Sequence, residues 1–333
     1  MRERGPPARV LRKASRMLFT SISRIGRSLL VVLLVSLAVV SLMSMAPGSV
    51  ASVILGEDAT PESIAALNAK LGMDQPFWAQ YLDWLGNAVR GDLGTSPLTG
   101  QPVTEAIVER LPVTLQLAAM ALAIALVVSV LLAVASAARP GSPVDRAINV
   151  LSSVFLSVPA FIAGPVLIYV LALQLGWFPV IGWSDLGEGI GANLRAALLP
   201  AISIALIEIA AFHRVLREDL IGTLQEDFVG AARAKGMGAV YVMFRHALRP
   251  SSMSLVTLAG INLGRLVGGT VIVETLFLLP GLGQLLTTSI VSRDLVMVQG
   301  VVVFVAVVYV VINTVVDLSY RLIDPRVRKV ATA

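Results

Sequence analysis

Residues 226–250 read EDFVGAARAKGMGAVYVMFRHALRP, a segment of charged and small residues that lies between two long apolar runs. Its first half is rich in alanine, which is a strong helix former, and Gly236 and Gly238 then break the helix. A second short helix is expected over 239–248, where apolar residues recur at helical spacing. This apolar stripe consists of Val240, Met243, Phe244 and Ala247. The segment therefore predicts two short helices joined by a hinge at Gly236.

The chain around this segment has the composition of a membrane protein. Of its 333 residues, 56% are hydrophobic and 14% are charged, whereas soluble domains carry roughly 25% charged residues. An apolar bilayer core of about 30 Å needs a helix of roughly 20 residues. Six apolar runs approach or exceed that length, namely 29–46, 113–137, 148–175, 196–212, 253–279 and 297–320. We therefore expect an all-α membrane protein with six transmembrane helices.

The basic residues indicate the orientation, because Lys and Arg are enriched in loops on the cytoplasmic side. With a cytoplasmic N-terminus, the inside segments hold 20 of the 26 Lys and Arg residues. These segments are 1–28, 138–147, 213–252 and 321–333. Both termini are then cytoplasmic, and nucleic acid is not expected as a partner, because the basic residues form no stripe with interleaved aromatics. A cleaved signal peptide is the competing interpretation of residues 2–51, but its apolar core would exceed the usual 7–15 residues.

The predicted organisation has five parts. A cytoplasmic basic tail (1–28) precedes the first transmembrane helix (29–46) and an extracytoplasmic insertion (47–112). A five-helix core (113–320) contains the cytoplasmic segment 213–252, and a short cytoplasmic tail (321–333) follows. The insertion is expected to be small and helical, with Thr60 capping a helix that begins at Pro61.

Prolines predict distortions in two of the core helices. The third helix contains Pro159 and Pro165, and the fourth is expected to open with Pro200. Because proline removes a backbone hydrogen bond and bends a helix, these elements are expected to be kinked or re-entrant. Either a cavity that must open or simple tolerance by neighbouring helices accounts for such bends.

Four ionisable residues lie within the apolar runs, where each costs roughly 2.5–3.5 kcal/mol on insertion scales. Glu274 and Asp317 lie about one turn from a helix end, so we expect them to reach the interface. Arg265 lies too far from either end of its run and must face protein or a wet cavity. Three interpretations stay open: a structural pair with Glu208, a place in the translocation pathway that meets substrate carboxylates, and contact with a second subunit.

Catalytic and metal-binding signatures are lacking in the sequence. There is no cysteine, and His213 and His246 lie 33 residues apart without neighbouring carboxylates at ligand spacing; we expect these histidines to cap helices. No GxxxxGK[ST] loop, G-x-S-x-G elbow or HExxH motif occurs. The sequence therefore predicts no enzyme activity, cofactor or metal in this chain.

Two kinds of partner suit the segment 226–250. One is the inner membrane leaflet, with basic side chains against lipid phosphates. These side chains are Arg233, Lys235, Arg245 and Arg249. The other is a protein, which the small Ala231, Ala232 and Ala234 favour, because a lipid-binding helix benefits from larger apolar residues.

The pattern Glu-Asp-Phe-Val-x-Ala-Ala-Arg-Ala-Lys-Gly at 226–236, followed by Arg-His-Ala-Leu-Arg at 245–249, resembles the EAA-type motif of ATP-binding-cassette importer permeases. The similarity is greatest to the B-type permease of dipeptide and oligopeptide importers. It continues through most of the chain, in QYLDWLGNAVRGDLGTS (80–96), PVTEAIVERLPVTLQL (102–117), VETLFLLPGLGQLL (273–286) and DLSYRLIDPR (317–326). Pro250 and Arg265 depart from the usual pattern.

The resemblance implies the type I importer permease arrangement in a bacterial cytoplasmic membrane. It implies a second, C-type permease, two ATPase subunits that use ATP and Mg²⁺, and an extracytoplasmic binding protein that delivers a peptide. Relatives of this class move nickel chelates or glutathione, which are the alternative substrates. A secondary transporter is the rival class, but no convincing internal repeat supports it.

By the same resemblance, the segment 226–250 couples the permease to the ATPase. Gly236 is the implied hinge, and Ala231, Ala232 and Ala234 fit a groove on the ATPase. The residues that would flank this joint are Glu226, Asp227, Arg233 and Lys235. Closure of the ATPase pair would then switch the helices between inward-open and outward-open states.

Overall fold

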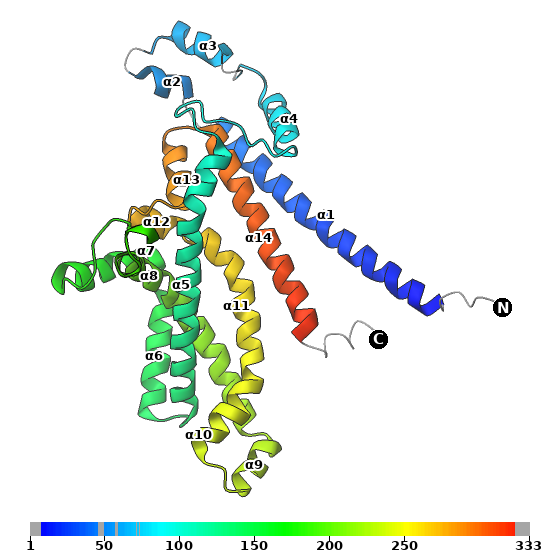
Figure 1. Cartoon of the computed structure of the whole chain (residues 1–333), viewed down its shortest axis with the longest axis vertical. Helices are drawn as coiled ribbons and strands as arrows, with labels where there is room; N and C mark the ends of the chain where they lie inside the picture. Colours follow the sequence, from blue (N-terminus) through cyan, green and yellow to red (C-terminus); the bar gives the residue numbers. More distant parts are fainter. Residues whose placement is uncertain (1–7, 46–49, 57–58, 71, 73, 324–333) are drawn as a thin grey trace. The chain divides into compact units, whose positions relative to one another are not determined.

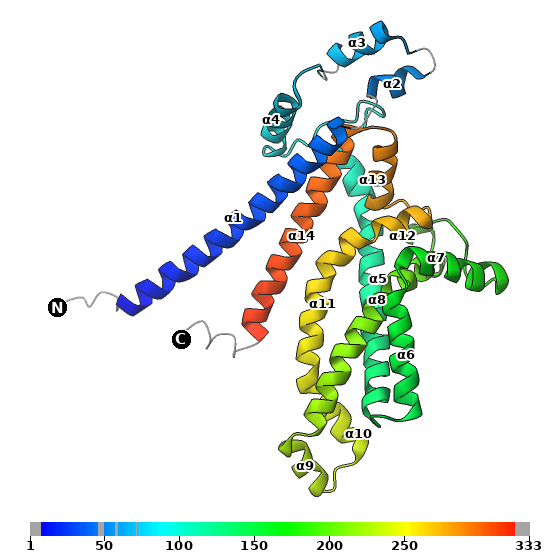
Figure 2. The same cartoon turned by 180° about the vertical axis from the view of Figure 1, so that it is seen from behind.

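The computed structural model describes residues 8–323 apart from 46–49, 57–58, 71 and 73, and its regular elements are helices (Figures 1 and 2). Within these residues, β pairing is limited to an isolated bridge between Thr95 and Pro102. The predicted all-α fold is therefore confirmed. The outer ends of both predicted tails, 1–7 and 324–333, lie outside the described residues, as do short stretches at the start of the insertion and within it.

Five helices in the described part of the chain are long and apolar enough to cross a membrane, and a bent pair brings the number to six if it counts as one span. Four of these five spans are single helices, namely α1 (Ala8–Met45), α5 (Val103–Ala137), α8 (Ile190–Leu224) and α14 (Leu295–Ile323). The fifth runs from α10 (Ala239–Tyr241) through η4 (Val242–Leu248) and α11 (Arg249–Gly269) to α12 (Val271–Leu276). The bent pair joins α6 (Pro143–Ser157) to α7 (Ala160–Leu167) and η2 (Ile168–Gln174).

The bend between α6 and α7 measures 108° and falls at Val158 and Pro159. The kink expected in the third apolar run is therefore present, and Pro159 lies at the N-cap of α7. Pro200 behaves differently from the expectation, because it lies inside α8 and does not open that helix. Helix α8 begins earlier, at Ile190, and its first turn is stabilised by the buried Asn193. The side chain of Asn193 forms hydrogen bonds with Gln116 and with the carbonyl of Ser184.

The chain divides into two compact units, and the first contains residues 1–104 and 289–310. Its insertion is helical where described, with α2 (Val50–Leu55), α3 (Pro61–Lys70) and α4 (Phe77–Ala88). The backbone N–H of Ser63 donates to Thr60 Oγ1 at 3.2 Å, so the predicted helix start is confirmed. Helix α5 already begins at Val103, within the range predicted for the insertion.

A buried polar contact holds two parts of this first unit together. The hydroxyl of Ser96 donates to the carboxylate of Asp294, and the N–H of Met297 donates to the same carboxylate at 3.0 Å. Asp294 thus caps the start of α14. Tyr81 of α4 and Ser36 of α1 share a second buried hydrogen bond of 2.7 Å.

The second unit contains residues 105–288 and 311–333, and α8 is its central helix. This helix packs against α6, α7 and α11, and its buried side chains include Phe212, Leu216 and Leu220. Helices α9 (Asp227–Ala234) and α10 lie at the end of this unit where α5 turns into α6, while α7 and α12 lie at the other end (Figures 1 and 2).

Candidate functional site

The candidate site is the hairpin formed by α9, α10 and η4, which we call the 226–248 hairpin. As expected, two short helices are joined by a glycine-containing turn. Asp227 lies in the first turn of α9 and Arg233 in its last turn. Both charges complement the helix dipole, typically by 0.3–1 kcal/mol each at exposed positions.

Gly236 ends α9 through its backbone geometry. Its φ is +80°, in the left-handed region that glycine adopts without a steric penalty. Its N–H donates to the carbonyl of Arg233 at 2.9 Å, and the N–H of Met237 donates to that of Ala232 at 3.3 Å. This pair of bonds is a Schellman motif. The structure therefore requires glycine here for a defined turn; motion at this position stays a prediction.

The inner side of the hairpin is a small apolar cluster. Val229 and Ala232 are buried against Val242, and Leu224 packs on them. Ala232 therefore does not share one exposed face with Ala231 and Ala234, although both of these are exposed. The expected three-alanine surface is wrong in this respect, because Ala232 and Val229 lie three residues apart, on the same side of a helix.

The apolar stripe expected on the second helix is confirmed for Met243 and Ala247 but wrong for Val240 and Phe244. The buried side chains are Val242, Met243 and Ala247, whereas Val240 and Phe244 are exposed. The buried Val242, which the stripe did not include, is the first residue of η4, and η4 is a π-helix. Its i→i+5 hydrogen bonds widen each turn, so the buried face follows a different spacing from the 3.6-residue period. No sequence period could have revealed this local change.

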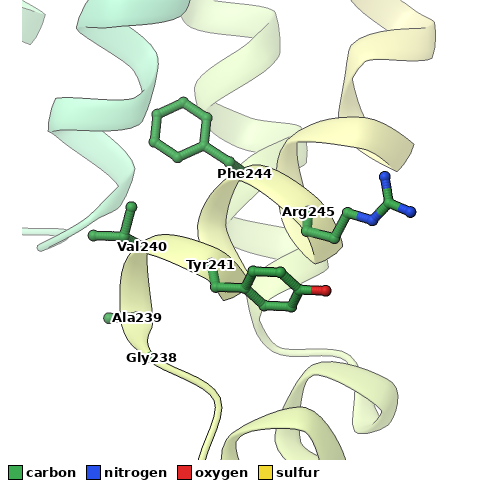
Figure 3. Close-up of a pocket in the computed structure, with 6 residues that line it drawn as sticks. All are labelled: Gly238, Ala239, Val240, Tyr241, Phe244 and Arg245. Carbon is green, nitrogen blue, oxygen red and sulfur yellow. The ribbon is translucent and has the colours of Figure 1, made fainter.

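A groove lies on the exposed side of this second helix. It is lined by Gly238, Ala239, Val240, Tyr241, Phe244 and Arg245, and its surface is mostly apolar. Figure 3 shows Val240 and Phe244 projecting to one side of the helix and Tyr241 and Arg245 to the other. Exposed Phe228 and Met237 add further apolar surface on the hairpin.

The charged residues predicted for this site surround α9. Glu226, Asp227, Arg233 and Lys235 are all exposed. The surface of the hairpin thus combines an apolar groove with acidic and basic side chains around it. Such an arrangement is typical of a protein interface. The exposed Phe228 and Tyr241 were not predicted as part of it, and the exposed Phe244 was expected on the apolar stripe.

A buried ion pair supports the same end of the second unit. Arg217 of α8 donates to both carboxylate oxygens of Asp145, at 2.7 and 2.8 Å. The backbone N–H of Gly141 and the hydroxyl of Ser136 also donate to Asp145. This network joins α5, the turn after it, α6 and α8. Neither residue was predicted as part of a site, although Arg217 lies within the basic segment 213–252.

Arg265 and Glu208 form a second ion pair, between α11 and α8. Arg265 Nη2 lies 2.5 Å from Glu208 Oε1. The Glu208 side chain is 5% exposed, whereas that of Arg265 is 60% exposed. The ion pair expected in one of the three interpretations is therefore present. Its glutamate is buried, whereas its arginine is mostly exposed.

The structure corrects the expectation for Glu274. Its side chain is completely buried and does not reach an interface. Thr114 Oγ1 donates to it at 2.8 Å and the N–H of Gly283 at 2.6 Å. Gly283 belongs to the first turn of α13 (Leu282–Val291), so the carboxylate lies at a helix N-terminus, where negative charge is stabilised. The side chain of Asp317 lies outside the described part of the structure.

The histidines differ from their expected capping role. His213 is buried inside α8, and its Nδ1 shares a hydrogen bond of 2.9 Å with Ser152. His246 lies within η4 and makes an edge contact with Tyr241. Among the described residues, no group of three or more His, Cys, Asp or Glu is arranged to hold a metal ion.

Two family models match the chain. Residues 125–329 match the model of the inner membrane component of binding-protein-dependent transport systems. Residues 17–118 match the model of the N-terminal part of the membrane component of such systems. The first match includes the 226–248 hairpin and both ion pairs.

Relatives align over nearly the whole chain. A Brucella abortus protein named as a permease of a peptide transport system is 37% identical, covering 92% of this chain and 98% of its own length. The oligopeptide transport system permease protein AppB of Bacillus subtilis is 36% identical, over 86% of this chain and 92% of its own. The di/tripeptide permease DppB of Pseudomonas aeruginosa is 34% identical, with coverages of 88% and 94%.

Proposed function

The chain belongs to the family of inner membrane components of binding-protein-dependent transport systems, and from that premise we propose that it is the permease subunit of an ATP-driven peptide importer. The observation that carries this proposal is the identity of 34–37% with peptide permeases across almost the full length. The substrate class is taken from the names of those relatives. Dipeptides and oligopeptides are therefore the proposed cargo.

The importer's ATPase is proposed to bind the 226–248 hairpin. The sequence has no phosphate-binding loop of its own, so ATP and Mg²⁺ would be used by two separate ATPase subunits. The exposed Ala231 and Ala234, the charged rim and the groove from Gly238 to Arg245 supply the contact surface. The Gly236 turn and the buried Val229–Ala232 side hold that surface in a fixed shape.

The remaining partners follow from the family. A second permease would complete the translocation pathway, and an extracytoplasmic binding protein would deliver the peptide. We place the hairpin on the cytoplasmic side of a bacterial inner membrane, with both termini on that side. The distribution of Lys and Arg supports this orientation.

Reconstitution tests the proposal. The complex, purified with its partner subunits, is placed in vesicles with the binding protein outside and ATP inside. Peptide uptake should require ATP and the binding protein, and a Mg²⁺-free preparation should show none. Uptake by this chain alone, driven by a proton or sodium gradient, would instead identify a secondary transporter.

The cargo requires a separate measurement. The binding protein is isolated with the complex, and mass spectrometry identifies the solute that it retains. Peptides are the expected result. Recovery of a nickel chelate or glutathione would leave the importer assignment intact and replace the substrate.

A further inference from the structure

The Arg265–Glu208 pair lies deep within the second unit. Glu208 has 18 residues of α8 before it and 16 after it. At 1.5 Å per residue, either end of the helix is about 24 Å or more away along its axis. Both partners lie in candidate membrane spans, α8 and the run from α10 to α12, and Arg265 is near the middle of the apolar run 253–279. The pair must therefore meet protein or water within the membrane.

The exposed side of α11 supports water rather than lipid. Arg265 shares this side with Ser254, Thr257, Ile261 and Gly268, which recur every three or four residues and are all exposed. An exposed guanidinium in hydrocarbon costs at least about 2.5–3.5 kcal/mol, and such groups almost always face a bundle interior or a water-filled cavity. The exposed side of α11 also carries the apolar Met253, Val256 and Ile261, but at the level of Arg265 lipid is an unsuitable neighbour and the passage of a permease is a suitable one.

The two partners satisfy each other only in part. In the described structure, Arg265 uses Nη2 alone, for Glu208 Oε1, although a guanidinium has five N–H donors. Glu208 Oε2 is buried and has no partner. The guanidinium therefore keeps most of its donors on its exposed side, in a planar fork that fits a carboxylate through two parallel bonds.

We propose that Arg265 binds the C-terminal carboxylate of the peptide during its passage, with Glu208 as the built-in carboxylate that holds Arg265 in place between transport events. This proposal rests on the proposed function, and it identifies the chemical group of the peptide that the permease binds. The α-carboxylate is the one anionic group common to unmodified peptides of every sequence. Because Glu208 keeps one donor occupied and competes for the rest, the substrate is bound weakly enough to leave, as conduction requires.

The test compares peptides as free acids with the same peptides as C-terminal amides. A defined set of di- to pentapeptides in both forms is offered to the reconstituted complex, and mass spectrometry measures initial uptake into the vesicles. The affinity of the isolated binding protein for each form is measured separately, and rates are compared with that protein saturated. The readout is the acid-to-amide ratio of rates, which changes in assembly or ATPase activity do not alter.

Arg265→Gln with Glu208→Gln is the main variant, because it removes both charges and leaves no lone buried carboxylate. We expect this double variant to assemble, to carry the amides at normal rates and to lower the acid-to-amide ratio about tenfold, as loss of one charged hydrogen-bonded contact implies. Glu208→Gln alone should keep the ratio, because Arg265 remains. Arg265→Lys should keep part of it, since the charge survives without the fork.

Three results would overturn the inference. An unchanged ratio in the double variant, with both single variants impaired, would make the pair purely structural. Loss of the second permease from the purified double variant would assign Arg265 to a subunit contact. Failure of the unaltered complex to take up any peptide with ATP would overturn the proposed function itself, and this outcome is recognised without any variant.

Discussion

Thr114 donates a hydrogen bond of 2.8 Å to Glu274, and both side chains are buried. The same hydroxyl accepts the N–H of Leu282 at 2.9 Å, while Gly283 donates to the other carboxylate oxygen. One threonine and one glutamate thus join α5, α12 and the start of α13. A carboxylate without a paired cation is stable here because hydrogen bonds and the positive end of a helix replace the water it has lost.

Close packing around Glu274 makes the adjoining glycines irreplaceable. A Cβ at Gly283 would overlap the backbone of Val271 and crowd the Glu274 carboxylate. We expect Gly283→Ala to destabilise the purified complex by about 1–3 kcal/mol, the usual cost of overpacking. Thermal unfolding in detergent measures the change.

Gly222→Ala is the matched control, because a Cβ at Gly222 meets nothing within 4 Å. This residue lies in α8, where alanine is a better helix former than glycine. Its unfolding temperature should stay the same or rise slightly. Equal losses in the two variants would show that crowding at Glu274 is not the cause.

The Asp145–Arg217 pair should be essential to the end of the second unit that carries the hairpin. Asp145→Asn leaves Arg217 without its ionic partner at a largely buried position, where breaking such a pair costs about 3–5 kcal/mol. We expect a sharp fall in the yield of assembled complex. Arg146→Gln changes an exposed charge at the next position and should have little effect. A normal yield of Asp145→Asn would contradict this account.

The sequence and the structure agree where a residue's role depends on near neighbours. Thr60 and Pro61 predict a helix start from local geometry alone, and Pro159 predicts the bend in the same way. The pair of Arg265 with Glu208 was one of three open interpretations, and the structure contains it.

Roles that depend on distant packing were not predictable. Glu274 lies near the end of an apolar run, so local position suggests the interface; its true partner, Thr114, is 160 residues earlier in the chain. Asn193 likewise extends α8 through a bond to Gln116 of α5. In the hairpin, the burial of Val242 and the exposure of Val240 and Phe244 were not predicted, and no periodic pattern in the sequence marks the π-helix.

Gly236 and Gly238 provide a second matched comparison, within the hairpin itself. A Cβ at either position meets nothing within 4 Å, but Gly236 has a φ of +80° and Gly238 a φ of −65°. Gly236→Ala should therefore cost about 1–2 kcal/mol through backbone strain, and Gly238→Ala a smaller amount, about 0.5–1 kcal/mol, because Gly238 is the N-cap of α10. We expect only the first variant to lower ATP hydrolysis stimulated by the loaded binding protein. Similar activities in both variants would remove the Schellman turn from the coupling mechanism.

Tryptophan substitutions at two alanines separate the shape of the hairpin from its contact with the ATPase. Ala232 is buried against Val229 and Val242, so Ala232→Trp should displace α9 and expose the hairpin to limited proteolysis. Ala234 is exposed, so Ala234→Trp should leave the protease pattern of the isolated permease unchanged.

The two variants should differ again when the ATPase is present. Ala234→Trp is expected to reduce co-purification of the ATPase subunits, or to leave ATP hydrolysis without peptide uptake, because the ring would obstruct the docking surface. An Ala234→Trp complex with normal subunit content and normal uptake per ATP would exclude this face of α9 from the interface. The groove between Gly238 and Arg245 would then be the remaining surface of the hairpin to test, with Phe244→Ala as the next variant, since its exposed ring can be removed without disturbing the buried side.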